Sequence, residues 1–240
     1  MILGNNVLAH VPDINDFIAG VSIVLKESGT VTFEFPHLLN LIELNQFDTI
    51  YHEHYSYLSL IFVKTLFEKH NMEIYDVEEL PTHGGALRIY GAHCNKKEIS
   101  KNVHNLLNKE DSLKSIQTYK DYAQKVCNTK RKILKTLIEL KTQGKTIVSY
   151  GAAAKGNTLF NYWGIRNDFI DYAVDLNPHK QNTYLPGVHI EVKSPEEIKK
   201  SKPDYIITPW NLKNEIKKQL DYTQQWGCKF ITLIPDIEIF

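Results

Sequence analysis

The sequence has no excess of one charge and no long apolar run. Its 28 basic and 28 acidic residues leave a formal net charge of zero over 240 residues, which argues against a nucleic-acid sleeve or a membrane-surface protein. No apolar run approaches the ~20 residues that cross a bilayer, and the N-terminus lacks the pattern of a signal peptide. We therefore expect a cytoplasmic protein with neither nucleic acid nor membrane as its partner.

Cysteine is scarce as well. Cys94, Cys127 and Cys228 lie far apart and form no CxxC pair, so neither a zinc ribbon nor a disulfide framework is supported. Hydrophobic residues make up 42% of the chain and charged residues 23%, as in globular rather than disordered proteins. Without an internal repeat or low-complexity segment, the length fits one large domain or two of ordinary size.

The hydrophobic pattern predicts an α/β protein. The opening MILGNNVLAHVPD is typical of a buried strand that runs directly into a loop, although a parallel strand needs neighbours on both sides. Apolar periodicity then predicts the following elements: a helix within 14–29, a strand at 30–36, a loop at 37–56, a helix at 57–70, and strands at 72–80 and 85–92 joined through PTHGG.

A second α/β region follows a helical segment. Residues 97–143 have almost no strand signal and predict one or two helices, the second long and ending at Gly144. A strand at 145–150, a helix at 154–162 and a strand at 169–174 then form a βαβ unit. PDYIITPW, a helix from Asn211, and KFITLIP add two strands with a helix between them. We interpret Trp210 and Trp226 as packing residues.

The segment FDTIYHEHYSY (residues 47–57) concentrates tyrosine, histidine and acidic residues. An HxH pair could chelate a metal, but nothing nearby completes a ligand set of the usual spacing, so we predict no metal. A polar surface loop is the second interpretation. Acid–base chemistry is the third and fits best, because histidine accepts a proton near neutral pH, a carboxylate can hold its tautomer, and tyrosine can donate to an oxyanion.

The turn after residue 150 is the second motif. Gly151, Ala153 and Gly156 fall on a GxGxxG frame, and Asp175 ends the next strand, much as in a dinucleotide-binding fold. The methyl group of Ala153 hinders the approach of a pyrophosphate, which weakens the NAD interpretation. A phosphate held by the helix N-terminus and Lys155, and a tight turn without a ligand, both remain open.

Long motifs give the chain a family resemblance. They are NNVLAHVPDINDF, FEFPHL, FDTIYHEHYSYLS, THGGALRIY, GAAAKGNTLFNYWGI, VDLNPHKQNTYLPGVHI and PWNLKNEI, in this order. Over nearly its whole length the chain resembles the three-domain S-adenosylmethionine-dependent sugar C-methyltransferases, which act on nucleotide-linked 4-keto deoxysugars. Those enzymes have an N-terminal zinc domain, a middle class I methyltransferase domain and a C-terminal Rossmann-like domain.

The N-terminal part of this chain differs from the domain pattern of that family. The resemblance implies the C-terminal half of a class I methyltransferase Rossmann-like domain at 1–96, a helical linker at 97–143, and a second Rossmann-like α/β domain at 144–240. The zinc-binding cysteines and the glycine-rich cofactor loop are absent, as in a fragment or a chain completed by another. We therefore expect this chain alone to bind S-adenosylmethionine weakly or not at all.

The resemblance also implies roles for single residues. His54 matches the general base that takes the proton beside the ketone, and Glu53 matches a residue that supports it. Tyr51 and His10 match candidate donors to the enolate oxygen, while His52 is unassigned.

Binding residues follow from the same comparison. Asn5 and Asn6 lie where the methionine part of the cofactor would sit, and Lys155 and Asn157 are candidates for the phosphates of the nucleotide-linked sugar. The predicted function is histidine-assisted C-methylation of that sugar. The alternatives are a nucleotide-sugar-binding module without activity and an NAD-dependent enzyme.

Overall fold

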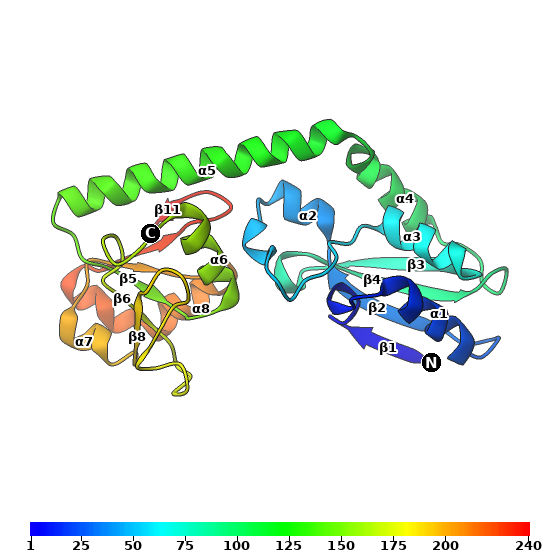
Figure 1. The fold of residues 1–240 in the computed structure, drawn as a ribbon, viewed down its shortest axis with the longest axis horizontal. Coiled ribbons are helices and arrows are strands. Elements are labelled where there is room, and N and C mark those ends of the chain that lie inside the picture. Colours follow the sequence, from blue (N-terminus) through cyan, green and yellow to red (C-terminus); the bar gives the residue numbers. More distant parts are fainter. The chain divides into compact units, whose positions relative to one another are not determined.

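The computed structural model describes residues 1–240, apart from the side chain of His83. The chain divides into two compact units (Figure 1). The first consists of Met1–Asn45 and His52–Tyr122, and the second of Gln46–Tyr51 and Ala123–Phe240. The short segment Gln46–Tyr51 therefore belongs to the second unit, although residues of the first unit flank it on both sides.

The first unit is built on a four-stranded sheet in the order β1-β2-β4-β3. β1 and β2 are parallel, whereas β4 is antiparallel to both β2 and β3. Its strands are β1 (Ile2–Asn5), β2 (Val31–Pro36), β3 (Met72–Leu80) and β4 (Ala86–His93), and its helices include α1 (Ile14–Val24), α2 (Leu38–Glu43), α3 (Leu60–Lys69) and α4 (Lys101–Lys109). Helices α3 and α4 pack against β3.

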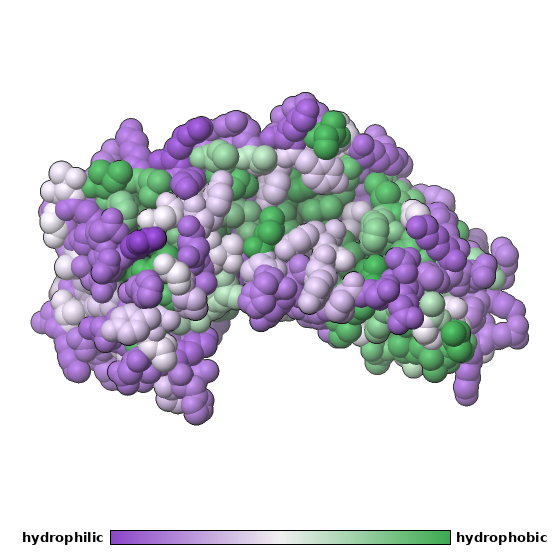
Figure 2. Space-filling view, viewed as in Figure 1, coloured by the Kyte–Doolittle hydropathy of each residue, from purple (hydrophilic) through white to green (hydrophobic). Residues whose placement is uncertain are grey.

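Local sequence signals explain where these helices start. Asp13 caps α1 because its Oδ1 accepts a hydrogen bond from the Asp16 N–H at 3.0 Å, and Ser59 caps α3 by accepting from the Phe62 N–H at 3.1 Å. Such caps satisfy donors that a helix N-terminus leaves unpaired. Apolar surface remains over the β1 and α1 end of this unit (Figure 2), where Leu3 and Ile23 are exposed.

A buried carboxylate ties the helical segment after α4 to the first unit. Glu110, fully buried, accepts hydrogen bonds from His37 Nε2 at 2.7 Å, the Leu60 N–H at 2.7 Å and the Ile61 N–H at 2.8 Å. Two of these donors belong to the first turn of α3, so a residue 50 positions downstream of Leu60 completes the N-terminus of that helix.

The second unit is built on a seven-stranded sheet in the order β11-β10-β9-β5-β6-β8-β7. Strands β10, β9, β5, β6 and β8 are parallel, with β11 and β7 antiparallel at the edges. Chain order reverses between β5 and β9, which is the switch point of a doubly wound sheet. The strands are β5 (Ile147–Tyr150), β6 (Tyr172–Val174), β7 (Thr183–Tyr184), β8 (Glu191–Lys193), β9 (Tyr205–Ile207), β10 (Lys229–Thr232) and β11 (Glu238–Ile239).

Helices connect and flank these strands. The long α5 (Ile116–Thr142) begins in the first unit and ends in the second, and α6 (Ala154–Trp163) follows β5. Two shorter helices, α7 (Glu197–Ser201) and α8 (Lys213–Gln219), complete the crossovers. Within the described part of the chain, no helix combines the length and apolar character required to cross a membrane.

The α/β class and most predicted elements agree with the structure, although β7, β8, β11 and α7 were not predicted. Residues 37–56 were predicted as a loop, but they contain α2 and a 3-10 turn, Phe47–Thr49. Helix α2 is only six residues long and is held by the burial of Leu39, Leu41 and Ile42, so its periodicity is too short to detect. The predicted boundaries at 96/97 and 143/144 stay predictions, while the compact units divide after Tyr122.

Candidate functional site

The histidine cluster, which consists of His10 and His54, lies at the carboxyl end of β1 in the first unit. Asn6, with a left-handed φ of 54°, turns the chain from β1 into the 3-10 turn Leu8–His10. The Ala9 carbonyl then accepts hydrogen bonds from the Tyr55 N–H at 2.9 Å and the Ser56 N–H at 3.2 Å. These bonds hold the loop after His52 beside His10, at the sheet edge where parallel strands usually place ligands.

Two histidine rings lie close together in this cluster, tilted by 47°. The centroids of His10 and His54 lie 4.8 Å apart, and the His54 ring meets the Tyr57 ring edge-on at 6.2 Å. His10 Nδ1 lies 2.8 Å from the Glu53 carbonyl oxygen. Because a carbonyl only accepts, Nδ1 carries the proton, and neutral His10 keeps its lone pair on Nε2.

The cluster therefore offers two imidazoles for proton transfer. His54 is half-buried and His10 is exposed. The Glu53 side chain is exposed, and its carboxylate has no hydrogen bond or ion pair within the described residues, so its carbonyl rather than its carboxylate contacts the cluster. No three His, Cys, Asp or Glu side chains gather as metal ligands would in the part of the chain that the structure describes.

The other predicted residues of this cluster divide between the units. His52 is exposed and belongs to the first unit, whereas Tyr51 is half-buried and belongs to the second. The catalytic roles of His54, Glu53, Tyr51 and His10 stay predictions.

Asn5 and Asn6 lie at the carboxyl end of β1, where the methionine part of S-adenosylmethionine was expected. Asn5 is exposed at the end of β1, and the Asn6 N–H is taken by the Glu34 carbonyl at 2.8 Å. The crossover from β1 to α1 contains no glycine, so it offers no turn that lets backbone approach the adenosine closely. A cofactor role for these two asparagines stays a prediction.

A cavity of about 170 Å³ lies in the second unit at the switch point. It is bounded by the turn after β5, by α6, and by the segments that follow β9 and β10. Ligands of doubly wound sheets bind at this place. Apolar side chains form most of the wall, and the ionic or hydrogen-bonding groups include Asp48, Lys155 and Trp210.

Asp48 is the buried acid of this cavity wall. Its Oδ2 accepts a hydrogen bond from Trp210 Nε1 at 3.1 Å, and Lys155 Nζ lies 5.8 Å from the centroid of the Trp210 ring. Burial raises the pKa of Asp48 above its usual 3.8, against the opposing effects of the Lys155 charge and the Trp210 hydrogen bond.

Asn157 is arranged differently from Lys155. Its Oδ1 accepts a hydrogen bond from Asn161 Nδ2 at 3.2 Å along α6, and it is absent from the cavity lining that includes Lys155. A phosphate role for either residue stays a prediction, and the geometry favours Lys155.

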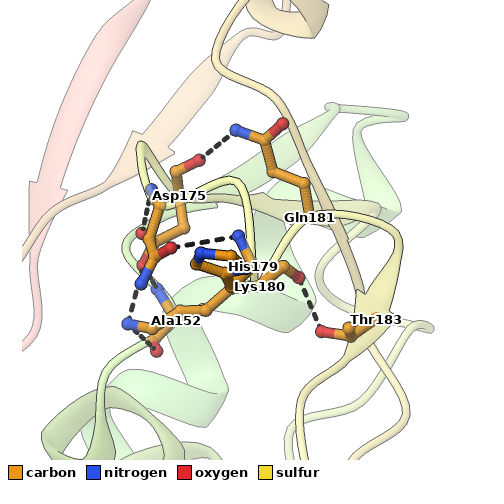
Figure 3. Close-up of polar contacts among 7 residues, drawn as sticks. Ala152, Asp175, His179, Lys180, Gln181 and Thr183 are labelled. Carbon is orange, nitrogen blue, oxygen red and sulfur yellow. Dashed lines mark hydrogen bonds and ion pairs between the residues drawn. The ribbon is translucent and has the colours of Figure 1, made fainter.

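The network around Asp175 disfavours the dinucleotide interpretation (Figure 3). Oδ2 accepts from the Ala152 N–H at 2.7 Å and Lys180 Nζ at 3.2 Å, and Oδ1 accepts from the Asn177 N–H at 2.8 Å. Although burial alone would raise it, the pKa of Asp175 is lowered by these bonds. A carboxylate so engaged is poorly placed to accept from a ribose diol.

Gly156 also disfavours the dinucleotide interpretation. A Cβ built there meets no atom within 4 Å, so the third glycine of the frame is not required for close helix packing. Gly151, by contrast, has φ +98° and shapes the turn itself.

The sequence did not point to the pairing of Asp48 with Trp210. Asp48 stands in the quoted cluster and Trp210 follows a predicted strand, but they are 162 positions apart. An acid beside the aromatic Phe47 was the one available signal. Trp226 is a packing residue as predicted: it packs against the core of the second unit and donates to the Pro203 carbonyl at 3.0 Å.

Comparisons with known proteins agree on one family. The family model of the C-methyltransferase C-terminal domain matches residues 81–235. C-methyltransferase NovU of Streptomyces niveus is 34% identical over 98% of this chain, and the chain spans 57% of the length of that relative.

Structural comparison is less informative. The crystal structure of UDP-D-quinovosamine 4-dehydrogenase from Vibrio fischeri is 21% identical with a TM-score of 0.30, covering 38% of this chain and 79% of that one. A likeness this low carries no argument about fold or function.

Proposed function

Because this chain belongs to the C-methyltransferase family, we propose that it takes part in methyl transfer from S-adenosylmethionine to a carbon beside the ketone of a nucleotide-linked deoxysugar. The observation that carries the proposal is the pair of imidazoles, His10 and His54, with ring centroids 4.8 Å apart at the carboxyl end of β1. A carbon acid needs a positioned base and a stabilised oxyanion, and this cluster contains a candidate residue for each role.

In this proposal His54 takes the proton from the carbon beside the ketone. His10, whose Nδ1 donates to the Glu53 carbonyl, is the first candidate donor to the enolate oxygen, from Nε2 in its imidazolium form. Tyr51 is the second candidate donor. S-Adenosylmethionine would supply an electrophilic methyl group to the resulting carbanion.

The cavity in the second unit supports a role in holding the nucleotide. Its apolar walls suit a planar ring, and Lys155 lies at the N-terminus of α6, where phosphate is favoured by the helix dipole and free N–H groups.

Solvent exchange tests the base directly and needs no methyl donor. The chain is incubated in deuterated buffer with a nucleotide-linked 4-keto-6-deoxysugar, and NMR follows loss of the proton beside the ketone. We expect exchange with the parent chain and a rate about 10²–10⁴-fold lower in His54→Gln, the typical effect of losing a general base. Glutamine keeps similar bulk and hydrogen-bonding groups but cannot take up the proton.

Two neighbouring variants serve as matched controls. Glu53→Gln should lose less than His54→Gln because its carbonyl, which contacts His10, is retained, and His52→Ala should lose least because His52 is exposed. A parent rate in His54→Gln would transfer the base role to His10. Sugar binding without exchange in the parent chain would instead favour a binding module.

A further inference from the structure

The segment Gln46–Tyr51 is held in the second unit by burial. Phe47 is 5% exposed, and its ring meets those of Tyr162 and Trp163 in α6 at centroid distances of 5.7 Å each. Asp48 is 2% exposed. The segment ends at Tyr51, two residues before Glu53. Part of the predicted catalytic loop therefore depends on packing within the second unit.

A hydrogen bond from Trp210 holds the buried side chain of Asp48 in this segment. Asp48 Oδ2 accepts from Trp210 Nε1 at 3.1 Å, while Oδ1 is buried without a hydrogen-bond partner among the described residues. The same indole lies under Lys155, whose Nζ is 5.8 Å from the ring centroid. Lys155, Trp210 and Asp48 therefore follow one another along the wall of a single cavity.

We propose that Asp48 and Trp210 are positioning residues that couple occupancy of this cavity by an anionic ligand to the segment that carries Tyr51. The proposal rests on the proposed function in taking a nucleotide as the ligand and Tyr51 as a site residue. An anion drawn to Lys155 neutralises the charge that favours ionised Asp48, so Asp48 takes up a proton. Its bond from Trp210 then weakens, because hydrogen bonds to a charged acceptor are stronger than those to a neutral one.

Few other titratable groups lie close enough to Asp48 to change its ionisation. The titratable side chains that share the cavity wall with Asp48 are Lys155 of α6 and Tyr150 of β5. Burial raises the pKa of Tyr150 above its usual 10.0, so this phenol stays neutral below that pH. Lys155 is then the one cationic group in the described lining whose charge a bound anion would compensate.

NMR of the whole chain tests the coupling. The indole N–H signal of Trp210 is assigned with Trp210→Phe, and its shift is followed against pH. We expect a titration that disappears in Asp48→Asn, which keeps an acceptor for the indole but cannot ionise. Uridine diphosphate is the probe, and saturation with it should move the midpoint upward. Lys155→Ala should move the midpoint upward without any probe.

Trp226 provides the matched control, because its indole donates to the Pro203 carbonyl and not to an acid. Its signal should keep its shift in all these experiments. The coupling is overturned if the pH midpoint of the Trp210 indole signal is unchanged in Lys155→Ala or under saturating uridine diphosphate. Failure of the probe to bind, with the midpoint still raised in Lys155→Ala, overturns the nucleotide part of the proposed function and leaves the Lys155–Asp48 link supported.

A kinetic readout separates positioning from general stability. Trp210→Phe keeps an aromatic ring and removes the donor, so the rate of solvent exchange at saturating sugar should fall about two- to tenfold, the effect typical of a lost hydrogen bond to a neutral acceptor. Trp226→Phe, an equal change elsewhere in the unit, should leave the rate at the parent value, and equal losses in both variants would reduce the Trp210 effect to stability alone.

Discussion

Removal of the Glu110 carboxylate should destabilise the first unit more than the substitution of any surface residue. Glu110 is fully buried and accepts from His37 Nε2, the Leu60 N–H and the Ile61 N–H at 2.7, 2.7 and 2.8 Å. In Glu110→Ala all three donors lose their acceptor. Two of them are N–H groups of the first turn of α3, which have no partner inside the helix.

The expected loss follows from the number of stranded donors. A buried donor without a partner costs about 1–3 kcal/mol, and breaking one side of a buried ionic pair typically costs about 3–5 kcal/mol. Because water and small shifts rescue part of this loss, we expect Glu110→Ala to lower the free energy of unfolding by about 3–5 kcal/mol. Glu110→Gln keeps one acceptor oxygen for His37 and Leu60 and loses the Ile61 bond, so we expect about 1–3 kcal/mol.

Urea denaturation followed by far-UV circular dichroism measures these differences. Asp111→Ala is the control, because the neighbouring Asp111 side chain is 75% exposed and pairs only with Lys114 one turn away; surface changes of this kind stay within about 0.5 kcal/mol. If Glu110→Ala unfolds at the same urea concentration as Asp111→Ala, Glu110 does not hold the start of α3. Hydrogen exchange at the Leu60 and Ile61 amides should also accelerate in Glu110→Ala, because both amides lose their acceptor.

Two further predictions concern the turn after β5. Gly151→Ala should destabilise the chain by about 1–2 kcal/mol because φ is +98° there, whereas Gly156→Ala should stabilise it by about 0.5–1 kcal/mol because a helical Cβ meets open space; thermal unfolding compares the two, and equal effects would contradict the conformational argument. Asp175→Asn should lower stability at pH 7 by about 1.5–3 kcal/mol. The pKa of Asp175 is lowered from 3.8, so its contribution is present above that value and is lost as pH falls through the folded pKa. The difference between parent and variant should therefore shrink in acid urea titrations, and a constant difference would exclude ionisation as its cause.

The sequence by itself determined the elements that carry enough periodic residues. Helix α5 repeats its apolar positions over 27 residues and was predicted as a long helix ending at Gly144. Strands β3 and β4 alternate over nine and eight residues and were predicted within a few residues. The motif around residues 47–57 was also found, because unusual composition is a linear property. Strands β7 and β11 have two residues each, too few for any period to be visible, and their pairing partners alone define them.

Tertiary structure alone decided which side chains meet. Glu110 reaches His37 across 73 positions and Trp210 reaches Asp48 across 162, and no spacing rule connects residues so far apart. The same holds for the proton on His10, because the Glu53 carbonyl that places it on Nδ1 lies 43 positions away. Burial decided the rest: whether an acid such as Asp48 is a solvated surface group or a raised-pKa residue in a cavity wall depends on the atoms that exclude water from it, and those come from several distant segments.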